Sequence, residues 1–303
     1  MRGEGVLLLG GGGFIGRSLA VRLAERGDAV HILARQPLAG FDAGPVQIHC
    51  GSLGDSEVLR RLLPRCRTVI HLASESTPGS SAGSPTREAG NILPTLALLE
   101  ALQAHEPIHL IFFSSGGTLY GNPASLPVPE TAPVAPLSYH GAGKAAQEAF
   151  MHAFRARGRA VTVLRPSNTY GPGQSLRAGF GLVRTLLEHA RQGTVPEIWG
   201  DGEAVRDFVY VEDVVEACLR FVDKPEDSGT YNVGSGEGYS INAVARMIGE
   251  TSGLPLPLAY RPGRAGDVKQ VVLDISRLRA TGWEPRVSLA EGIRRTWEWL
   301  RHS

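Results

Sequence analysis

Short apolar runs alternate with longer segments of helical pattern along the first half of this chain, and this alternation strongly constrains the fold. The apolar runs predict buried strands at Val6–Leu9, Ala29–Leu33, Val46–His49, Thr68–Leu72, His109–Phe113 and Val161–Leu164. The segments between them predict helices at Gly16–Arg26, Ser56–Leu63, Ile92–Ala104 and Gly143–Arg157. Parallel strands need such crossovers, which are right-handed and cover both faces of a sheet. The pattern predicts an α/β fold with a doubly wound parallel sheet of the Rossmann type.

A glycine-rich loop, GGGGFIG, lies between the first predicted strand and the first predicted helix. Glycines in this context let the backbone approach a pyrophosphate and place it at the positive N-terminus of the helix. The loop therefore predicts dinucleotide binding. The candidate contacts are Gly10, Gly13, Phe14, Ile15 and Gly16.

The end of the second predicted strand bears on the choice of cofactor. An NAD site commonly has an acidic residue here for the ribose 2′-hydroxyl, but this chain has Ala34 followed by Arg35. Since a guanidinium pairs well with a 2′-phosphate, Arg35 favours NADP over NAD. The alternative is that Arg35 is a solvated surface residue and leaves the choice open.

Turn residues become more frequent in the C-terminal half, as in NTYGPGQ, GSGEGYS and RPGRAGD. A strand at Phe208–Val211, followed by the helical EDVVEACLRFV, is expected to return the chain to the main sheet. We predict a dinucleotide-binding domain over residues 1–170, completed by about 205–234. A smaller C-terminal substrate-binding lobe is predicted over residues 171–204 and 235–303.

The charge and composition of the chain limit the partners to expect. The formal net charge of the 303 residues is +1, which gives no reason to expect nucleic acid or a membrane surface as a partner. The three cysteines are scattered and predict no metal site. The apolar run near the N-terminus is too short for a membrane span or a signal core, so a cytoplasmic protein is expected.

Eight motifs follow one another along essentially the whole chain: GGGGFIG, IHLAS, Asn91 at the start of a long helix, SSGGTLYG, PETAPVAPLSYHGAGK, RPSNTYGPGQ, GDGEAVRDFVYVEDV and RPGRAGD. Together they resemble the extended short-chain dehydrogenase/reductase family. Within it they are similar to the UDP-glucose 4-epimerase-like branch of NAD-dependent epimerases and dehydratases, which act on nucleotide sugars. The order of the motifs is more specific than any one of them.

The resemblance implies further site residues. The implied cofactor contacts are Ser52, Leu53, Leu72, Ala73, Ser74, Asn91, Ser114, Lys144 and Pro166. For the sugar nucleotide it implies Asn168 at the phosphates, Arg206 at the diphosphate, and Arg264 with Asp267 near the ribose. It also implies a homodimer formed through the helices Ile92–Ala104 and Gly143–Arg157.

At two positions this chain differs from the residue that the family usually has: near the adenine and at the catalytic hydroxyl. Ser52 stands where the family often has an aspartate near the adenine. Gly116 stands at the usual place of the catalytic serine or threonine in SSGGTLYG. The flanking Ser115 and Thr118 are the candidates to supply that hydroxyl.

A third departure affects the acid/base residue. The family has YxxxK here, but alignment on Lys144 places His140 at the position of the tyrosine, with Tyr139 beside it. Residues four apart differ by about 40° around a helix axis, and residues five apart by about 140°. His140 is therefore expected to share a face with Lys144. Three alternatives stay open: His140 is the acid/base, Tyr139 reaches the site through a shifted helix start, or catalysis is impaired.

The resemblance implies an epimerase that transiently oxidises carbon 4 of a nucleotide-linked sugar, with UDP as the expected nucleotide and with bound NAD or NADP. Arg35 favours a second possibility, an NADP-dependent reductase of keto-sugar nucleotides. The replacement of tyrosine by His140 favours a third, a protein that binds a sugar nucleotide and NAD(P) but has impaired catalysis.

Overall fold

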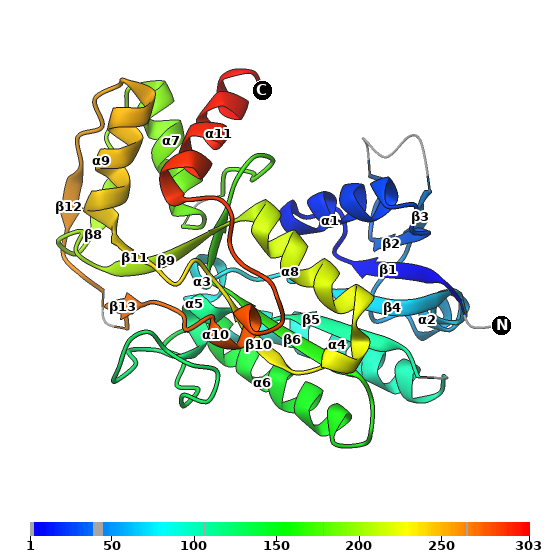
Figure 1. Cartoon of the computed structure of the whole chain (residues 1–303). Coiled ribbons are helices and arrows are strands. Elements are labelled where there is room, and N and C mark those ends of the chain that lie inside the picture. The colour runs from blue at the N-terminus through cyan, green and yellow to red at the C-terminus, as the bar shows by residue number, and fades with distance from the viewer. Residues whose placement is uncertain (1–2, 39–44, 106, 178, 265) are drawn as a thin grey trace.

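The computed structural model describes residues 3–38, 45–105, 107–177, 179–264 and 266–303. Its centre is a seven-stranded sheet with the order β10-β6-β5-β4-β1-β2-β3, in which every neighbouring pair is parallel (Figure 1). The strands are β1 (Gly5–Leu9), β2 (Val30–Ala34), β3 (Val46–Cys50), β4 (Cys66–His71), β5 (His109–Phe113), β6 (Val161–Pro166) and β10 (Thr230–Val233). The predicted doubly wound parallel sheet is confirmed.

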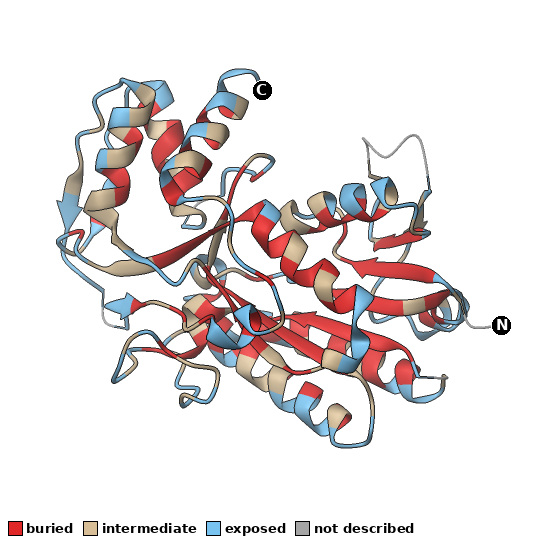
Figure 2. Cartoon of the chain, viewed as in Figure 1, coloured by how far each residue is buried: buried red, intermediate tan, exposed pale blue. Residues whose placement is uncertain are grey.

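Helices cover both faces of this sheet. On one face, α1 (Phe14–Glu25) packs against α8 (Val211–Asp223). On the other, α4 (Ala89–Gln103) packs against both α2 (Ser56–Leu62) and α6 (Tyr139–Arg155). Each face has its own cluster of buried apolar side chains, and the strands between the helices are largely buried except for the edge strand β3 (Figure 2). Shorter helical segments are η1 (Leu63–Arg65), α3 (Pro78–Ser81), η2 (Pro85–Glu88), α5 (Gly116–Leu119) and η3 (Pro225–Asp227).

A smaller lobe lies beyond the carboxyl ends of the main strands (Figure 1). In it, β9 pairs in parallel with β7 and β13 and antiparallel with β11, while β8 pairs with β12. The strands are β7 (Asn168–Tyr170), β8 (Glu197–Trp199), β9 (Val205–Tyr210), β11 (Gly238–Ser240), β12 (Ala259–Arg261) and β13 (Gln270–Val271). The helices of this lobe are α7 (Leu182–Gln192), α9 (Ile241–Ser252) and α11 (Leu289–Arg301), whereas the short α10 (Ser276–Arg279) packs against β10 of the main sheet. A third apolar cluster joins α7, α9 and α11.

Two expectations about individual elements are wrong. The strand expected at Phe208–Val211 to rejoin the main sheet lies in the smaller sheet as part of β9, and β10 takes the edge of the main sheet. Helix α6 begins at Tyr139, four residues before the predicted Gly143. It begins there because the hydroxyl of Ser138 caps it by accepting a hydrogen bond from the backbone N–H of Gly141.

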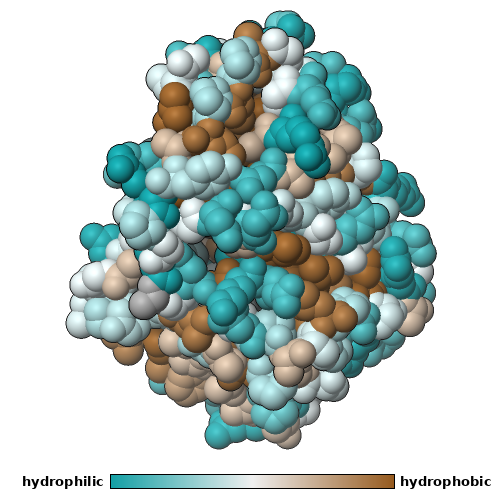
Figure 3. Space-filling model, turned by 90° about the vertical axis from the view of Figure 1, so that its left-hand side faces the viewer, coloured by the Kyte–Doolittle hydropathy of each residue, from teal (hydrophilic) through white to brown (hydrophobic). Residues whose placement is uncertain are grey.

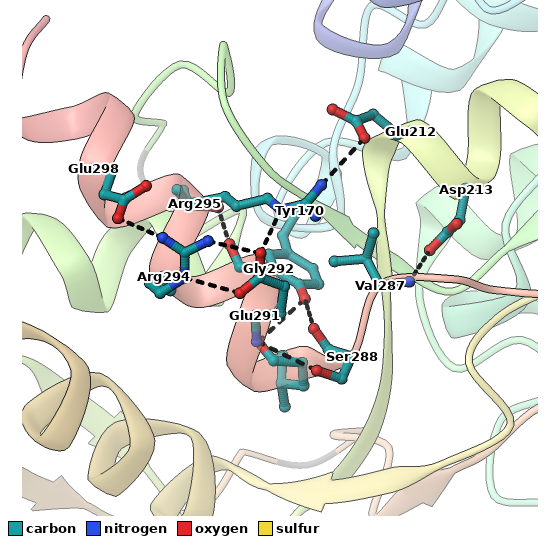
Figure 4. A network of polar contacts seen from close by, with 12 residues as sticks. Tyr170, Glu212, Asp213, Val287, Ser288, Glu291, Gly292, Arg294, Arg295 and Glu298 are labelled. Carbon is teal, nitrogen blue, oxygen red and sulfur yellow. Dashed lines mark hydrogen bonds and ion pairs between the residues drawn. The ribbon is translucent and has the colours of Figure 1, made fainter.

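Polar contacts fix the C-terminal helix α11 against the rest of the protein (Figure 4). The hydroxyl of Tyr170 at the end of β7 donates to the carbonyl of Leu289, 3.3 Å away. Asp213 in α8 accepts from the backbone N–H of Val287, which leads into α11, at 3.1 Å. Since α8 covers the main sheet, the bond to Asp213 ties the smaller lobe to it, and the bond of Tyr170 holds α11 against β7.

The surface facing the viewer in Figure 3 mixes hydrophobic patches with hydrophilic residues. Among the residues that the structure describes, no helix combines the length and apolar character needed to cross a membrane.

Candidate active site

The glycine loop brings three backbone segments together at the carboxyl end of β1. Gly10 has a φ of +90°, and a Cβ there would lie 2.7 Å from the backbone nitrogen of Ala73, which follows β4. A Cβ on Gly16 would overlap the carbonyl oxygen of Gly10, so both positions require glycine. Gly13 is the N-cap residue of α1 and has no side chain that could accept from the first N–H groups of the helix. Phe14 and Ile15 lie in the first turn. This arrangement suits a dinucleotide because uncapped N–H groups at a helix start can bind phosphate.

The residues predicted at the adenosine end lie on the surface. Arg35 directly follows β2, and its guanidinium forms an exposed ion pair of 2.5 Å with Glu75, which follows β4. Ser52 is exposed, and its hydroxyl accepts a hydrogen bond from the backbone of Gly54. Leu53 packs against the apolar cluster on one face of the sheet. The positive charge of Arg35 therefore has a partner in the protein.

The remaining predicted cofactor residues follow the ends of the central strands. Leu72 lies beside the glycine loop, with its N–H bonded to the carbonyl of Leu9 at the end of β1. Ser74 donates to the carbonyl of Ser76, and Pro166 ends β6. Within the described part of the chain, the buried hydroxyl of Ser114 has no hydrogen-bond partner. A buried hydroxyl without a partner is unfavourable, and a bound ligand could satisfy it.

His140 and Lys144 lie on the buried face of α6, as expected from their spacing. Lys144 is 5% exposed and His140 is 8% exposed, whereas Tyr139 is 49% exposed. The ammonium of Lys144 donates to the carbonyl of Phe113 at the end of β5, over 2.9 Å. Nδ1 of His140 lies 3.0 Å from the hydroxyl of Ser76. The observed helix start thus turns the histidine, and not the tyrosine, toward the face that carries the lysine.

Burial shifts the pKa of both residues. Burial and the charge of Lys144 lower the pKa of His140 to about 4, while Glu88 opposes this shift. Burial lowers the pKa of Lys144 to about 8, with Glu88 and Glu148 opposing. Near neutral pH this pair is a neutral imidazole beside an ammonium, so the imidazole can accept a proton.

Two hydroxyls lie in the SSGGTLYG segment, close to the start of α6. Thr118 donates to the hydroxyl of Ser115, the residue before α5, at 2.8 Å. The carbonyl of Thr118 packs against Gly141, which has no room for a Cβ. A Cβ at Gly116 would lie 2.8 Å from the carbonyl oxygen of Arg165, which explains why no serine or threonine stands there.

Asn91 lies at the centre of a buried network that the sequence did not reveal. Its Nδ2 donates to the hydroxyl of Ser76 at 2.8 Å and to the carboxylate of Glu88 at 2.9 Å. Its Oδ1 accepts from the backbone N–H of Glu75 at 2.7 Å, which fixes the orientation of the amide. Since Ser76 also contacts His140, the network links Glu88 to the histidine. A hint in the sequence was Gly143, because a glycine inside a helix suggests a close neighbour.

The four predicted substrate residues lie in the smaller lobe and at its junction with the main sheet. Asn168 begins β7, and its amide donates to the carbonyl of Asp207 at 2.8 Å. Arg206 donates to the carbonyl of Val268 at 2.5 Å. Arg264 lies over the ring of Trp199, with its guanidinium carbon 3.7 Å from the ring centre. Asp267 accepts from the backbone N–H of Arg264. Gly266 in the same loop lies against Leu137, so the loop reaches the segment that leads into α6.

Asp207, between Arg206 and Phe208 in β9, is a second residue that sequence reasoning missed. It is fully buried, and its carboxylate accepts hydrogen bonds from Ser167, Ser235, Gly236 and Leu273. These partners follow β6, β10 and β13. Asp207 therefore holds the ends of two main strands against the smaller sheet.

Comparisons with known proteins agree with this architecture. The model of the NAD dependent epimerase/dehydratase family matches residues 6–234. A UDP-glucose 4-epimerase of Mycolicibacterium smegmatis is 31% identical, and the match covers 98% of each chain. The structure of Thermus thermophilus UDP-glucose 4-epimerase in complex with NAD superposes with a TM-score of 0.91, at 33% identity and 100% coverage of both chains. That of the Thermotoga maritima enzyme with UDP-glucose has a TM-score of 0.90, at 34% identity, covering 98% of this chain and 99% of that one.

Proposed function

The chain belongs to the NAD dependent epimerase/dehydratase family, and we propose that it is a nucleotide-sugar 4-epimerase in which His140 takes the place of the usual tyrosine. The observation that carries this proposal is the buried pair of His140 and Lys144 on one face of α6. Relatives that act on UDP-glucose, and neighbours solved with NAD or UDP-glucose, support the reaction and the substrate class.

His140 is the proton acceptor in the proposed mechanism. In the tautomer that carries its proton on Nδ1, His140 donates to the hydroxyl of Ser76, and the unprotonated Nε2 is free to accept the proton of the hydroxyl at carbon 4 of the sugar. A nicotinamide cofactor held at the glycine loop and by Lys144 would supply reversible hydride transfer at carbon 4 of the sugar. His140 removes the hydroxyl proton in the first half and returns it to the same oxygen in the second, so no net proton is consumed. Lys144 holds the nicotinamide ribose, and Ser115 and Thr118 offer hydroxyls to the sugar oxygen.

The two lobes divide these roles in our proposal. Residues 1–170, with about 205–234, hold the dinucleotide, and residues 171–204 with 235–303 hold the sugar nucleotide. Arg264 and Asp267 of the second group contact the sugar nucleotide, together with Asn168 and Arg206 from the strands β7 and β9 at the junction of the two lobes. Two of these four side chains are cationic, which suits a diphosphate.

We propose NAD as the cofactor, although Arg35 taken alone favours NADP. Glu75 already balances the charge of Arg35 through their ion pair. A 2′-phosphate would bring further negative charge close to Glu75, whereas a ribose 2′-hydroxyl could donate to its carboxylate. The neighbour solved with NAD supports the same choice.

We also propose a homodimer formed through α4 and α6. Leu93 on α4 is 64% exposed and Phe150 on α6 is 41% exposed. Large exposed apolar side chains on two helices that pack together are typical of a protein interface. Sedimentation of the purified protein would give its mass directly.

The proposed function is tested with purified protein, UDP-glucose, UDP-N-acetylglucosamine and their galacto epimers, each with added NAD or NADP. We expect interconversion of at least one pair without net change in nicotinamide absorbance, and NAD as the nucleotide released on denaturation. Net oxidation of NADPH with a keto-sugar nucleotide would instead identify a reductase. Tight binding without turnover on the whole panel would identify a binding protein and reject the epimerase.

The pKa values of His140 and Lys144 predict a broad pH profile. The mechanism needs neutral His140, which takes up a proton as the pH falls through about 4, and charged Lys144, which loses its proton as the pH rises through about 8. We therefore expect kcat/KM to be flat between these values and to fall tenfold per pH step outside them. An acid limb near pH 6.5, the ordinary value for histidine, would contradict the buried environment of His140. Circular dichroism at each pH separates titration from unfolding.

A further inference from the structure

Glu88 is a buried carboxylate in the middle of the site and has no role in the mechanism above. It ends η2 and is 6% exposed. One oxygen, Oε2, accepts from Asn91, and within the described part of the chain the other, Oε1, has no hydrogen-bond partner. A buried carboxylate is unfavourable unless an opposite charge or hydrogen bonds compensate it. Its single hydrogen bond among the described residues suggests that nearby positive charge supplies the rest of the compensation.

The positive charge comes from α6. The segment η2, which ends at Glu88, packs against α6, and the negative charge of Glu88 raises the pKa of both the neutral His140 and the cationic Lys144. The other titratable groups near Lys144 are Glu148, one turn further along α6, and the buried His71 at the end of β4, which is uncharged because burial lowers its pKa to about 3. Glu88 is therefore the acidic group that acts on both members of the pair.

Gly143 provides the space for this carboxylate. A Cβ at Gly143 would overlap Oε2 of Glu88, so the carboxylate lies against the backbone of α6 at Gly143, the residue before Lys144. Glycine is less favourable than alanine inside a helix. Its presence in a buried helical turn is explained by the packing of Glu88.

We propose that Glu88 is the counter-charge of the His140–Lys144 pair, a positioning residue that keeps Lys144 charged and lets the imidazole accept a proton beside it. Through Asn91 and Ser76 the same carboxylate also fixes the orientation of His140. A tyrosine at this place would work as an anion and would itself balance the lysine, whereas a histidine is neutral or cationic. The negative charge that the histidine does not supply comes from Glu88. The expected change in turnover rests on the proposed function, whereas the expected change in the pKa of Lys144 does not.

The charge can be measured without turnover, because the chain has only three lysines, Lys144, Lys224 and Lys269. Lysine labelled with ¹³C at Cε gives three NMR signals, and the two exposed lysines serve as internal references. In Glu88→Gln the side-chain carbonyl can still accept from Asn91, but the charge is gone. We expect the Lys144 signal to titrate at lower pH than in the wild type. The matched control is Glu100→Gln, an exposed glutamate on α4, which should leave the titration unchanged.

A second variant displaces the carboxylate without removing it. In Gly143→Ala the new methyl group should push Oε2 away, so Lys144 should again titrate at lower pH, while the preference of helices for alanine offsets part of the loss in stability. Unchanged Lys144 titration in Glu88→Gln, measured on folded protein, would overturn the proposal. Should Glu88→Gln fail to fold, the same readout in Gly143→Ala decides.

Turnover separates this inference from the proposed function. A tenfold larger acid dissociation constant for Lys144 would reduce its charged fraction at pH 8 from about a half to about a tenth, so turnover there should fall about fivefold. The alkaline limb of the pH profile should move to lower pH, which a purely structural role would not cause. If the wild type turns over no sugar nucleotide, the proposed function fails, and the NMR titration still decides the role of Glu88.

Discussion

His140→Gln is expected to lower kcat for epimerisation by about 10²–10⁴-fold, which is the usual contribution of a general acid/base. Glutamine is similar in size to histidine and can still hydrogen-bond Ser76, but it cannot accept the proton from the sugar hydroxyl. Tyr139→Phe, at the exposed neighbouring position, should keep kcat within about twofold, since a surface substitution away from the site has little effect. Both variants are measured at saturating substrate, near pH 7.

The pair of variants distinguishes the two candidate residues directly. Loss of turnover in Tyr139→Phe with retention in His140→Gln would show that the tyrosine reaches the site in the working enzyme. Thermal unfolding of both variants serves as the control, because His140 is buried and its replacement could affect the fold. A loss of activity at an unchanged melting temperature assigns the effect to chemistry.

Asp207→Ala is expected to lower the free energy of unfolding by about 3–5 kcal/mol, because several buried donors lose their acceptor at once. These donors include the backbone N–H groups of Ser235, Gly236 and Leu273. Asp207→Asn keeps one acceptor oxygen and should lose less. Urea denaturation followed by circular dichroism measures the change.

The matched control for Asp207→Ala is Asp223→Ala. Asp223 is an exposed aspartate at the end of α8, and it pairs with Arg26 on the surface. Exposed ion pairs contribute about 0–1 kcal/mol, so this variant should unfold close to the wild type. Equal unfolding midpoints for Asp207→Ala and Asp223→Ala would contradict the view that Asp207 holds the two sheets together.

Hydrophobic pattern predicted six of the seven strands of the main sheet, and their predicted bounds differ from the observed ones by at most two residues. The central strands are buried and contain apolar runs such as LIFF in β5, whereas the edge strand β3 is partly exposed and β10 was not predicted. The pattern was less informative for β9, which is also apolar, because an apolar run does not say which sheet the strand joins. Pairing depends on contacts between segments far apart in the chain.

Helix geometry placed His140 on the face of Lys144 even though the start of α6 was predicted four residues too late. The face depends only on the spacing of two residues, whereas the start depends on the Ser138 cap and includes Gly141 and Gly143, a residue type that is unfavourable inside a helix. Both glycines are explained by packing, against Thr118 and Glu88 respectively.

Glu88 and Asp207 could not be found from the sequence. Each is one acidic residue among many, and only the fold shows that it is buried among donors or charges from other segments. Ser76 was missed for the same reason, since its partner His140 lies 64 residues away.

Transient oxidation at carbon 4 is tested most directly with UDP-[4-²H]glucose, or with the same label in another sugar nucleotide that the panel shows to be a substrate. Hydride leaves and returns within one site, so we predict a galacto product that retains deuterium at carbon 4 and forms more slowly than the unlabelled product. The same incubation with His140→Gln should give almost no product. Loss of the deuterium to solvent, or undiminished turnover in His140→Gln, would contradict a 4-epimerase that uses His140 as its acid/base.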